Sequence, residues 1–473
     1  MHKLVTTALM WAVIAPWATI SVAAEPDAAL QQLRQDMAAL RADYEARLQR
    51  LEQRLQAAEA VRAASVLSAP APVLALPAMT APTSAVSAPA PALPLSAAPP
   101  LNVNAFNPAM SLILSGTYLH RSRLKGSAGV SGFRLPADAD IGPGERGFNL
   151  GETELGLAAS VDPAWRGATS LALHGDNSVS VEEAWVQTTA LGGGVSIKLG
   201  RALSGIGTLN AQHAHTWDFI DNPLAYQALL GTQVRDDGLQ LRWLAPLDQY
   251  LELGAELGRG LGFPAGNNSR NGAGQWALMG HTGGDVGASH SWRAGLSVLN
   301  ARAADLALQA QGASDSSVID SFTGRTRVWV VDAVWKWAPN GNATRTNFKL
   351  QGEWLRSTRQ GRLTASEAAD GPTAPTTTAA ATGWYLQGIY QFMPGWRVGL
   401  RSERLVPAAF DAAALGVGGL RPSKQTLVLE HNASEFSRLR LQIAQDRSRW
   451  GAAETQIGLQ YQMSLGAHAA HGF

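Results

Sequence analysis

The sequence predicts an all-β protein: a closed 16-stranded antiparallel transmembrane β-barrel, preceded by an N-terminal α-helical coiled coil and a Pro/Ala-rich linker. Three observations predict this fold class. Polar and apolar residues alternate in many segments after residue 107, and the connections between these segments are short and long in turn. Thirteen of the fifteen tryptophans also follow residue 107, and tryptophan is enriched where a barrel meets the membrane interface.

The composition narrows the class of protein. Charged residues make up 16% of the 473 residues, against about 25% in typical soluble domains. A barrel fits this composition because its apolar band occupies only alternate positions. The net charge of +1 argues against a nucleic-acid partner. The absence of cysteine rules out a disulfide framework, a thiolate metal site and a cysteine nucleophile.

Residues 1–24 are predicted to be a signal peptide. Lys3 supplies the positive start, the segment 8–20 is mostly apolar, and small residues at 22–24 suit cleavage before Glu25. The alternative is a membrane anchor, for which the apolar segment is short.

Residues 25–62 are predicted to form a coiled-coil helix. They contain no glycine, and their apolar residues follow a heptad seam with one four-residue step, a stutter, between Tyr44 and Leu48. The seam residues are Leu30, Leu33, Met37, Leu40, Tyr44, Leu48, Leu51, Leu55 and Ala58. A single amphipathic helix lying on another surface is the alternative.

Residues 63–107 are predicted to be a disordered Ala/Pro-rich linker. They contain no Asp, Glu, Lys or Arg, and nine prolines lie between Pro70 and Pro100. Such a segment favours extended conformations and cannot build a core.

Residues 108–473 are predicted to form the barrel. The expected strands are 109–123, 147–161, 165–175, 179–190, 194–201, 237–245, 249–258, 275–283, 289–302, 326–338, 345–357, 382–393, 395–405, 424–432, 437–447 and 455–467. The expected long loops are 124–146, 202–236, 259–274, 303–325, 358–381 and 406–423. Tight turns at one rim and long loops at the other are typical of outer-membrane barrels.

Alternation also predicts which face each strand turns to lipid. In 327–337 the odd positions, which include three tryptophans, are expected to face lipid, and Asp332 and Lys336 to face the lumen. The last strand alternates in the same way, and the chain ends at Phe473. A soluble, half-buried sheet is the alternative.

The inward positions of these strands carry charges of both signs. They are predicted to line the pore, and they are Arg242, Glu252, Glu256, Arg327, Asp332, Lys336, Lys349, Glu353, Arg397, Arg401, Glu403, Glu430, Arg438 and Arg440. Basic residues at alternate positions of one strand are also found in anion-selective pores. With both signs present, a mutually paired, hydrated wall is the favoured interpretation.

The long loop 202–236 follows the fifth predicted strand, which is where porins carry a loop that folds inward. By that resemblance it is expected to fold into the lumen and narrow it. His213, His215, Asp218 and Asp221 lie in it and offer nitrogen and carboxylate ligands of the kind that zinc uses. The alternative is a loop whose histidines only hydrogen-bond the wall. No catalytic constellation stands out, so the protein is not expected to be an enzyme, and no cofactor is expected beyond a transported Zn²⁺.

Several motifs resemble known families. Residues 181–187 followed by 195–201 are similar to paired strands of phosphate-selective porins. Other motifs resemble proteobacterial outer-membrane proteins often labelled zinc-regulated TonB-dependent outer-membrane receptors: 212–223, 280–285, 289–293, 335–342, 436–441 and 463–468. The resemblance covers 107–473. It implies a bacterial outer-membrane location, a homotrimer, assembly by the barrel-assembly machinery through Phe473, and a link to zinc.

The leading functional hypothesis is a porin-like channel in the outer membrane for passive passage of small hydrophilic solutes, including divalent metal ions such as zinc. The coiled coil would lie in the periplasm, where peptidoglycan is a candidate partner. The alternatives are a TonB-dependent metal receptor, an anion (phosphate) porin and a structural envelope tether. An energised receptor needs a plugged barrel of 22 strands, and the segment before the predicted barrel offers no plug.

Overall fold

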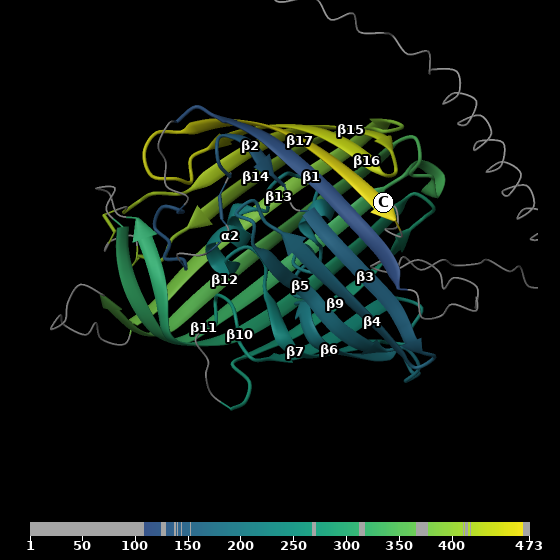
Figure 1. Ribbon diagram of the computed structural model, residues 1–473, viewed down its shortest axis with the longest axis horizontal. Coiled ribbons are helices and arrows are strands. Elements are labelled where there is room, and N and C mark those ends of the chain that lie inside the picture. The colour runs from purple at the N-terminus through teal and green to yellow at the C-terminus, as the bar shows by residue number, and fades with distance from the viewer. Residues whose placement is uncertain are drawn as a thin grey trace, which may run out of the picture. The chain divides into compact units, whose positions relative to one another are not determined.

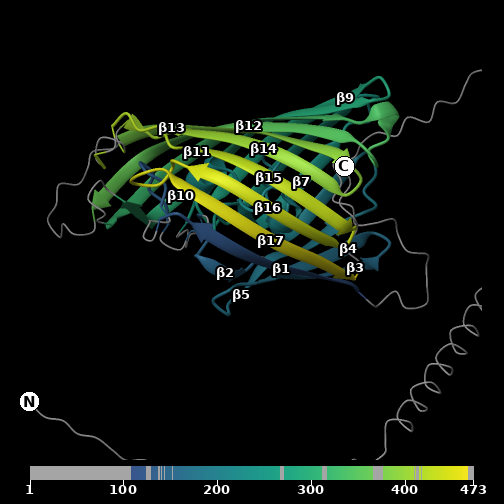
Figure 2. The ribbon, with the colours of Figure 1, turned by 90° about the horizontal axis from the view of Figure 1, so that it is seen from above.

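The computed structural model describes residues 108–466, with gaps at 124–128, 137–138, 140, 143, 152, 267–270, 312–316, 366–376, 410, 412–414 and 417. These residues form one antiparallel sheet that closes on itself (Figure 1 and Figure 2). Its strands are β1 (Ala109–Arg121), β2 (Gly147–Leu150), β3 (Thr153–Asp162), β4 (Trp165–Leu173), β5 (Val179–Thr188), β6 (Val195–Leu203), β7 (Arg235–Leu244), β8 (Tyr250–Gly258), β9 (Gln275–Val286), β10 (His290–Gln311), β11 (Ser317–Trp337), β12 (Asn347–Ala365), β13 (Thr377–Met393), β14 (Trp396–Val406), β15 (Ser423–Ser434), β16 (Ser437–Asp446) and β17 (Glu454–Gly466).

Strand β1 closes the barrel. On one side it pairs with β17, from Ser111 opposite Gly466 to Arg121 opposite Gln456. On the other side it pairs with β2 and then β3, which therefore act as one interrupted strand. Counted in this way, the described residues form a closed barrel of sixteen antiparallel strands, and each overlaps one of the sixteen predicted segments. The predicted fold class is confirmed for the barrel.

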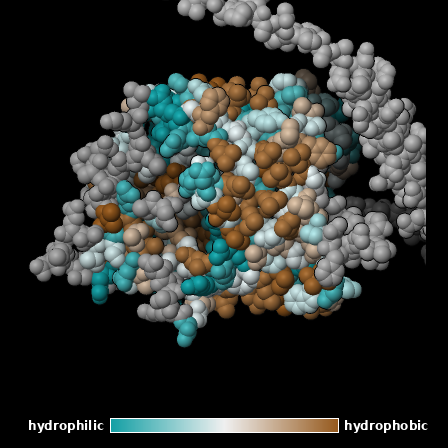
Figure 3. Space-filling view, in the orientation of Figure 1, coloured by the Kyte–Doolittle hydropathy of each residue, from teal (hydrophilic) through white to brown (hydrophobic). Residues whose placement is uncertain are grey.

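The outer face of the wall is apolar. Most alternate residues of β16 and β17 are exposed and hydrophobic, as with Leu439, Leu441 and Ile457. Trp329 and Trp335 on β11 face outward too, as predicted. Figure 3 shows apolar residues gathered over this wall. Since exposed apolar surface of this extent is costly in water, it fits a hydrocarbon environment.

Two predicted loops are largely strand. β10 and β11 continue their pairing to Gln311 and Ser317, and β12 and β13 run to Ala365 and from Thr377. The predictions of loops over 303–325 and 358–381 were therefore wrong. Apolar contacts stabilise the extension, because Ala303, Leu308 and Phe322 are buried together with Leu306 and Leu363 against them.

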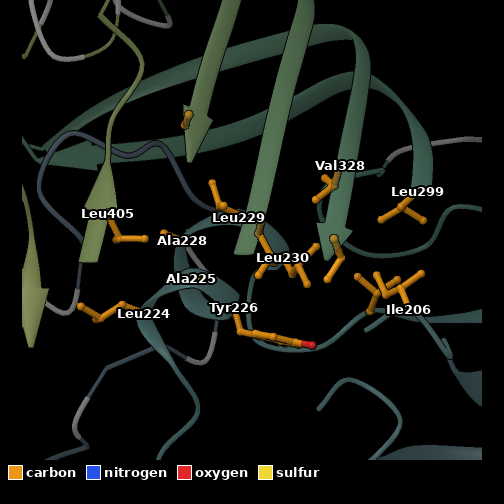
Figure 4. Packing of buried hydrophobic residues seen from close by; sticks show 14 of the residues in the cluster. Ile206, Leu224, Ala225, Tyr226, Ala228, Leu229, Leu230, Leu299, Val328 and Leu405 are labelled. Carbon is orange, nitrogen blue, oxygen red and sulfur yellow. The ribbon is translucent and has the colours of Figure 1, made fainter. Parts of the chain in front are cut away.

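The connection from β6 to β7 folds into the barrel, as predicted. It contains two short helices, η1 (Ala214–Thr216) and α2 (Leu224–Leu230). All seven residues of α2 are buried, and its apolar side chains meet inward-facing wall residues such as Val328 and Leu405 (Figure 4). Gly231 ends the helix in the left-handed conformation, φ 67° and ψ 30°, which glycine adopts without strain. Helix α2 was not among the sequence predictions.

Four predictions lie outside the described residues. They are the signal peptide 1–24, the coiled-coil helix 25–62, the linker 63–107 and the role of Phe473. They stay predictions. In the part of the chain that the structure describes, no helix is long and apolar enough to cross a membrane.

Candidate functional site

The candidate site is the interior constriction, where the loop 204–234 meets the wall. The two ends of this loop lie side by side, since the Ser204 amide donates to the Val234 carbonyl at 2.9 Å. Between them, Ile206, Leu224 and Tyr226 have no exposed surface. The loop is thus a packed part of the barrel interior rather than a segment in solvent.

Asp218 fastens the loop to the wall between two cations. Its carboxylate lies 2.7 Å from Lys349 Nζ and 2.5 Å from Arg397 Nη2, and Gln387 Nε2 donates to it at 3.1 Å. Burial alone would raise the pKa of Asp218, but Lys349 and Arg397 hold that pKa well below its usual range. Asp218 is therefore an ion-pair partner of two cations.

Asp221, three residues further along the loop, is held in the same way. Arg401 Nη2 lies 2.9 Å from its carboxylate, Lys424 is a second ion-pair partner, and Gln442 donates at 3.0 Å. Burial raises the pKa of Asp221, and Lys424 and Arg401 outweigh it and lower the pKa. Neighbouring cations compete with any metal ion for these two carboxylates, so metal binding by Asp218 and Asp221 stays a prediction.

Glu353 on β12 anchors the other part of the loop. Its carboxylate accepts hydrogen bonds from Tyr226 at 2.8 Å, Tyr385 at 2.7 Å and the Leu209 amide at 2.9 Å. Glu353 is 3% exposed. A buried carboxylate needs such donors because they replace the hydrogen bonds to water that it loses on burial.

The two loop histidines meet a carboxylate that sequence analysis did not single out. Glu154 Oε2 on β3 lies 3.3 Å from His213 Nδ1 and 3.0 Å from His215 Nδ1. The imidazole rings are stacked, with centroids 5.5 Å apart and planes inclined by 24°. Glu154, His213 and His215 are the group among the described residues whose ligand atoms lie close enough to share one metal ion, all within 4.8 Å.

Two further groups orient this cluster. His213 Nε2 lies 3.1 Å from Glu183 Oε2 on β5, and the Ser170 hydroxyl donates to Glu154 Oε1. Burial lowers the pKa of His213, but contacts with Glu154 and Glu183 outweigh it and raise that pKa well above its usual value.

The predicted pore-lining residues divide into two sets. Seven are 8% exposed or less, in contact with the loop or with one another, so they hold the constriction together: Asp332, Glu353, Arg401, Glu403, Glu430, Arg438 and Arg440. Five are inward and keep more contact with solvent: Arg242, Glu252, Lys336, Lys349 and Arg397. The carboxylate of Glu256 accepts from Ser204, Gly205 and Arg242.

Arg327 is a correction to the pore-lining set. It is exposed and shares the outward face of β11 with Trp329, and no register shift lies between them. Its position in the alternation, rather than its charge, decides where it points.

A basic belt lines the interior near the rim of tight turns. We define it as the nine inward basic residues that lie within three positions of a strand end at that rim: Arg166, Lys198, Arg242, Arg293, Lys336, Lys349, Arg397, Arg438 and Arg440. Glu252 is an acidic residue with the same placement. Side-chain exposure of the belt is 21–24% at Arg242, Arg293, Lys349 and Arg397.

Three belt members were missed by sequence reasoning. Arg166 and Lys198 lie over the buried ring of Trp185, at 5.4 Å and 4.5 Å from its centroid, and Arg293 lies near Asp332. Alternation could have found Lys198 and Arg293, because their apolar neighbours Leu199 and Trp292 mark the opposite face.

Comparison with known proteins gives one close relative. A protein of Aquifex aeolicus (strain VF5), described as uncharacterised, is 30% identical to this chain over 404 residues. The match covers 79% of this chain and 81% of the Aquifex protein. No protein-family model matches the chain.

Similar solved structures are outer-membrane proteins of low sequence identity. In-vitro folded OmpT of Vibrio cholerae is 10% identical, with a TM-score of 0.46 and coverage of 77% of this chain and 99% of that one. The anion-selective porin from Comamonas acidovorans is 12% identical (TM-score 0.46; 76% and 99%). The outer-membrane channel DcaP of Acinetobacter baumannii is 13% identical (TM-score 0.45; 76% and 97%).

Proposed function

The chain belongs to the same family as the Aquifex aeolicus protein, and we propose that it is a porin-like channel of the outer membrane through which small hydrophilic solutes diffuse passively. The single observation that carries the proposal is the closed sixteen-stranded wall, apolar outside and charged inside, with one loop folded into its interior. Outward apolar and inward polar residues are the pattern of a barrel that surrounds an aqueous path.

The charge of the interior favours anions as solutes. On the turn side of the loop, the similarly placed acidic residues are Glu252 and Asp285. Arg242 also pairs with Glu256, and Lys349 and Arg397 share Asp218. Basic residues therefore outnumber acidic ones along the belt. Most other inward charges are buried in ion pairs with the loop or with one another, so they add little to the field along the path. Rings of one sign select ions of the opposite sign.

Divalent cations such as zinc are the second candidate solutes. The observation that favours them is the cluster of Glu154, His213 and His215, whose donor atoms suit a transition metal. A cation path past this cluster would have to cross the belt, which makes cations the weaker candidate.

Reversal potentials in planar bilayers test the proposal. In a KCl gradient, the purified barrel is expected to conduct with a preference for chloride, and Lys336→Gln with Lys349→Gln to reduce that preference. Arg327→Gln removes a charge from the outer face and is the matched control, with unchanged selectivity. A barrel without conductance contradicts the channel, whereas a cation preference, with currents altered by Zn²⁺, supports the second candidate.

The proposal also extends to residues outside the described part of the chain. We expect residues 25–62 to form a periplasmic coiled coil that joins three copies, and Phe473 to be recognised by the assembly machinery. Deleting 25–62 separates the channel from the tether hypothesis: a channel still conducts, whereas a tether loses its envelope phenotype. An energised receptor would instead lose uptake when the proton-motive force is collapsed.

A further inference from the structure

The contact between the loop and β3 brings three donor atoms to one point inside the barrel. We propose that Glu154, His213 and His215 bind one resident divalent transition-metal ion, which cross-links the loop to the wall. The inference concerns a fixed ion, so it does not depend on what the barrel conducts.

Two of the three spacings between the donor atoms match a metal coordination sphere, and all three atoms lie within 4.8 Å of one another. Glu154 Oε2 lies 3.3 Å from His213 Nδ1 and 3.0 Å from His215 Nδ1. Ligand atoms bonded to tetrahedral zinc at about 2.0–2.2 Å lie roughly 3.3 Å from one another. The donors can therefore surround an ion with only small side-chain movements.

Two of these atoms lack the hydrogen bonds that buried polar atoms normally have. Glu154 Oε2 and His213 Nδ1 are buried, and neither makes a hydrogen bond of acceptable geometry. Glu154 as a whole is 7% exposed. Their contact with each other is an ion pair only when His213 is protonated, and a bound cation would give both atoms a partner of the geometry that this contact lacks.

The surroundings resemble the outer sphere of a metal site. Glu183 contacts the other nitrogen of His213 at 3.1 Å, which would fix the tautomer that leaves Nδ1 free to coordinate. Ser170 donates to the other oxygen of Glu154, which leaves Oε2 turned toward the histidines. Glu154 from the wall and His213 from the loop are thus each held in place by a neighbouring side chain.

The donor set indicates the kind of metal ion. Two imidazole nitrogens and one carboxylate oxygen suit Zn²⁺ and similar ions, whereas Ca²⁺ and Mg²⁺ prefer oxygen donors. Three protein ligands leave a fourth position for water. The wall supplies one ligand from β3 and the loop supplies two, so the bound ion would act as a fastener at the constriction.

Metal binding to the folded barrel in detergent tests the inference. Titration of Zn²⁺ against a chromophoric chelator is expected to show one tight site in the wild type, and Co²⁺ at this site to give the intense visible absorption of tetrahedral coordination. Both signals are expected to disappear in His213→Ala with His215→Ala, and Glu183→Gln to weaken binding by about 10–100-fold. His290→Ala, at a histidine stacked on outward-facing Trp335, is the matched control and leaves both signals intact.

Heat-modifiable migration in gels shows that each variant has folded. If the double variant does not fold, Glu154→Gln, which keeps the side-chain shape, gives the same comparison. The inference is overturned if the folded wild type binds no metal, or if Glu154→Gln or the double variant binds as the wild type does. If the barrel conducts but binds no metal, the channel proposal stands and the metal site is refuted. If it binds metal but does not conduct, only the metal site stands.

Discussion

At the scale of single residues, the buried charges of the loop are matched one by one to charges of the wall. Asp218 lies between Lys349 and Arg397, and Asp221 between Arg401 and Lys424. Removing one partner of such a pair leaves the other charge buried without compensation, which costs far more than the pair itself contributes. These carboxylates therefore position the loop.

Asp221→Ala is expected to destabilise the seating of the loop by about 3–5 kcal/mol, the usual cost of breaking a buried ion pair. Arg401 would keep Glu403 as a partner, but Lys424, about 2% exposed at the side chain, would lose the carboxylate that pairs with it. Faster protease cleavage within 204–234 and noisier single-channel currents would report the change.

The matched control is Asp248→Ala, in the exposed turn between β7 and β8, which is expected to change stability by less than about 0.5 kcal/mol. Equal cleavage rates in Asp221→Ala and the wild type would contradict the fastening role of Asp221.

At the scale of elements, the loop is separable from the wall. The wall is held by continuous strand pairing from β1 to β17, and the loop adds an interior core around α2. The loop ends are already joined by the hydrogen bond from Ser204 to Val234. A short turn can therefore bridge them when the loop is removed.

Replacing residues 206–232 by a two- to four-residue hairpin turn is expected to leave a folded barrel with several-fold higher conductance. The wall charges that now pair with the loop would become hydrated. Bilayer recording and heat-modifiable migration measure the two effects. Replacing Asp176, Asn177 and Ser178 by glycines in the exposed turn after β4 is the control. Unchanged conductance after excision would show that the loop does not limit the path.

At the scale of the whole molecule, the wall of the barrel has an apolar outer face and a polar inner face. Leu441 is 39% exposed on the outside of β16, whereas its neighbours Arg440 and Gln442 face inward and contact the loop. An arginine at the midplane of the lipid-facing band of a barrel costs about 2–4 kcal/mol, and near the interface about 0–1 kcal/mol.

Leu441→Arg is accordingly expected to destabilise the barrel in lipid vesicles by about 2–4 kcal/mol, since it lies near the middle of β16. Gln445→Arg, on the same face near the strand end, is the control at about 0–1 kcal/mol. Denaturant unfolding in vesicles measures both values. Equal costs at the two positions would argue against a bilayer around this wall.

The sequence by itself determined the wall: the sixteen strands, their order and the face that each turns outward. Alternation and turn chemistry are local, so they can be seen in one sequence. The same rule corrects Arg327, which shares the face of Trp329. Loop lengths were less predictable, because the extension of β10 to β13 depends on apolar contacts such as Leu308 with Phe322, across separate strands.

Only the tertiary structure decided the site. The spacing of His213 and His215 suggested a ligand pair, but the carboxylate that meets them, Glu154, lies about sixty residues away on β3. Asp218 and Asp221 had the right chemistry for a metal and became ion-pair partners, because folding the loop inward placed wall cations beside them. Which charges form ion pairs depends on which side chains lie close together in the folded protein, and local sequence patterns do not encode that proximity.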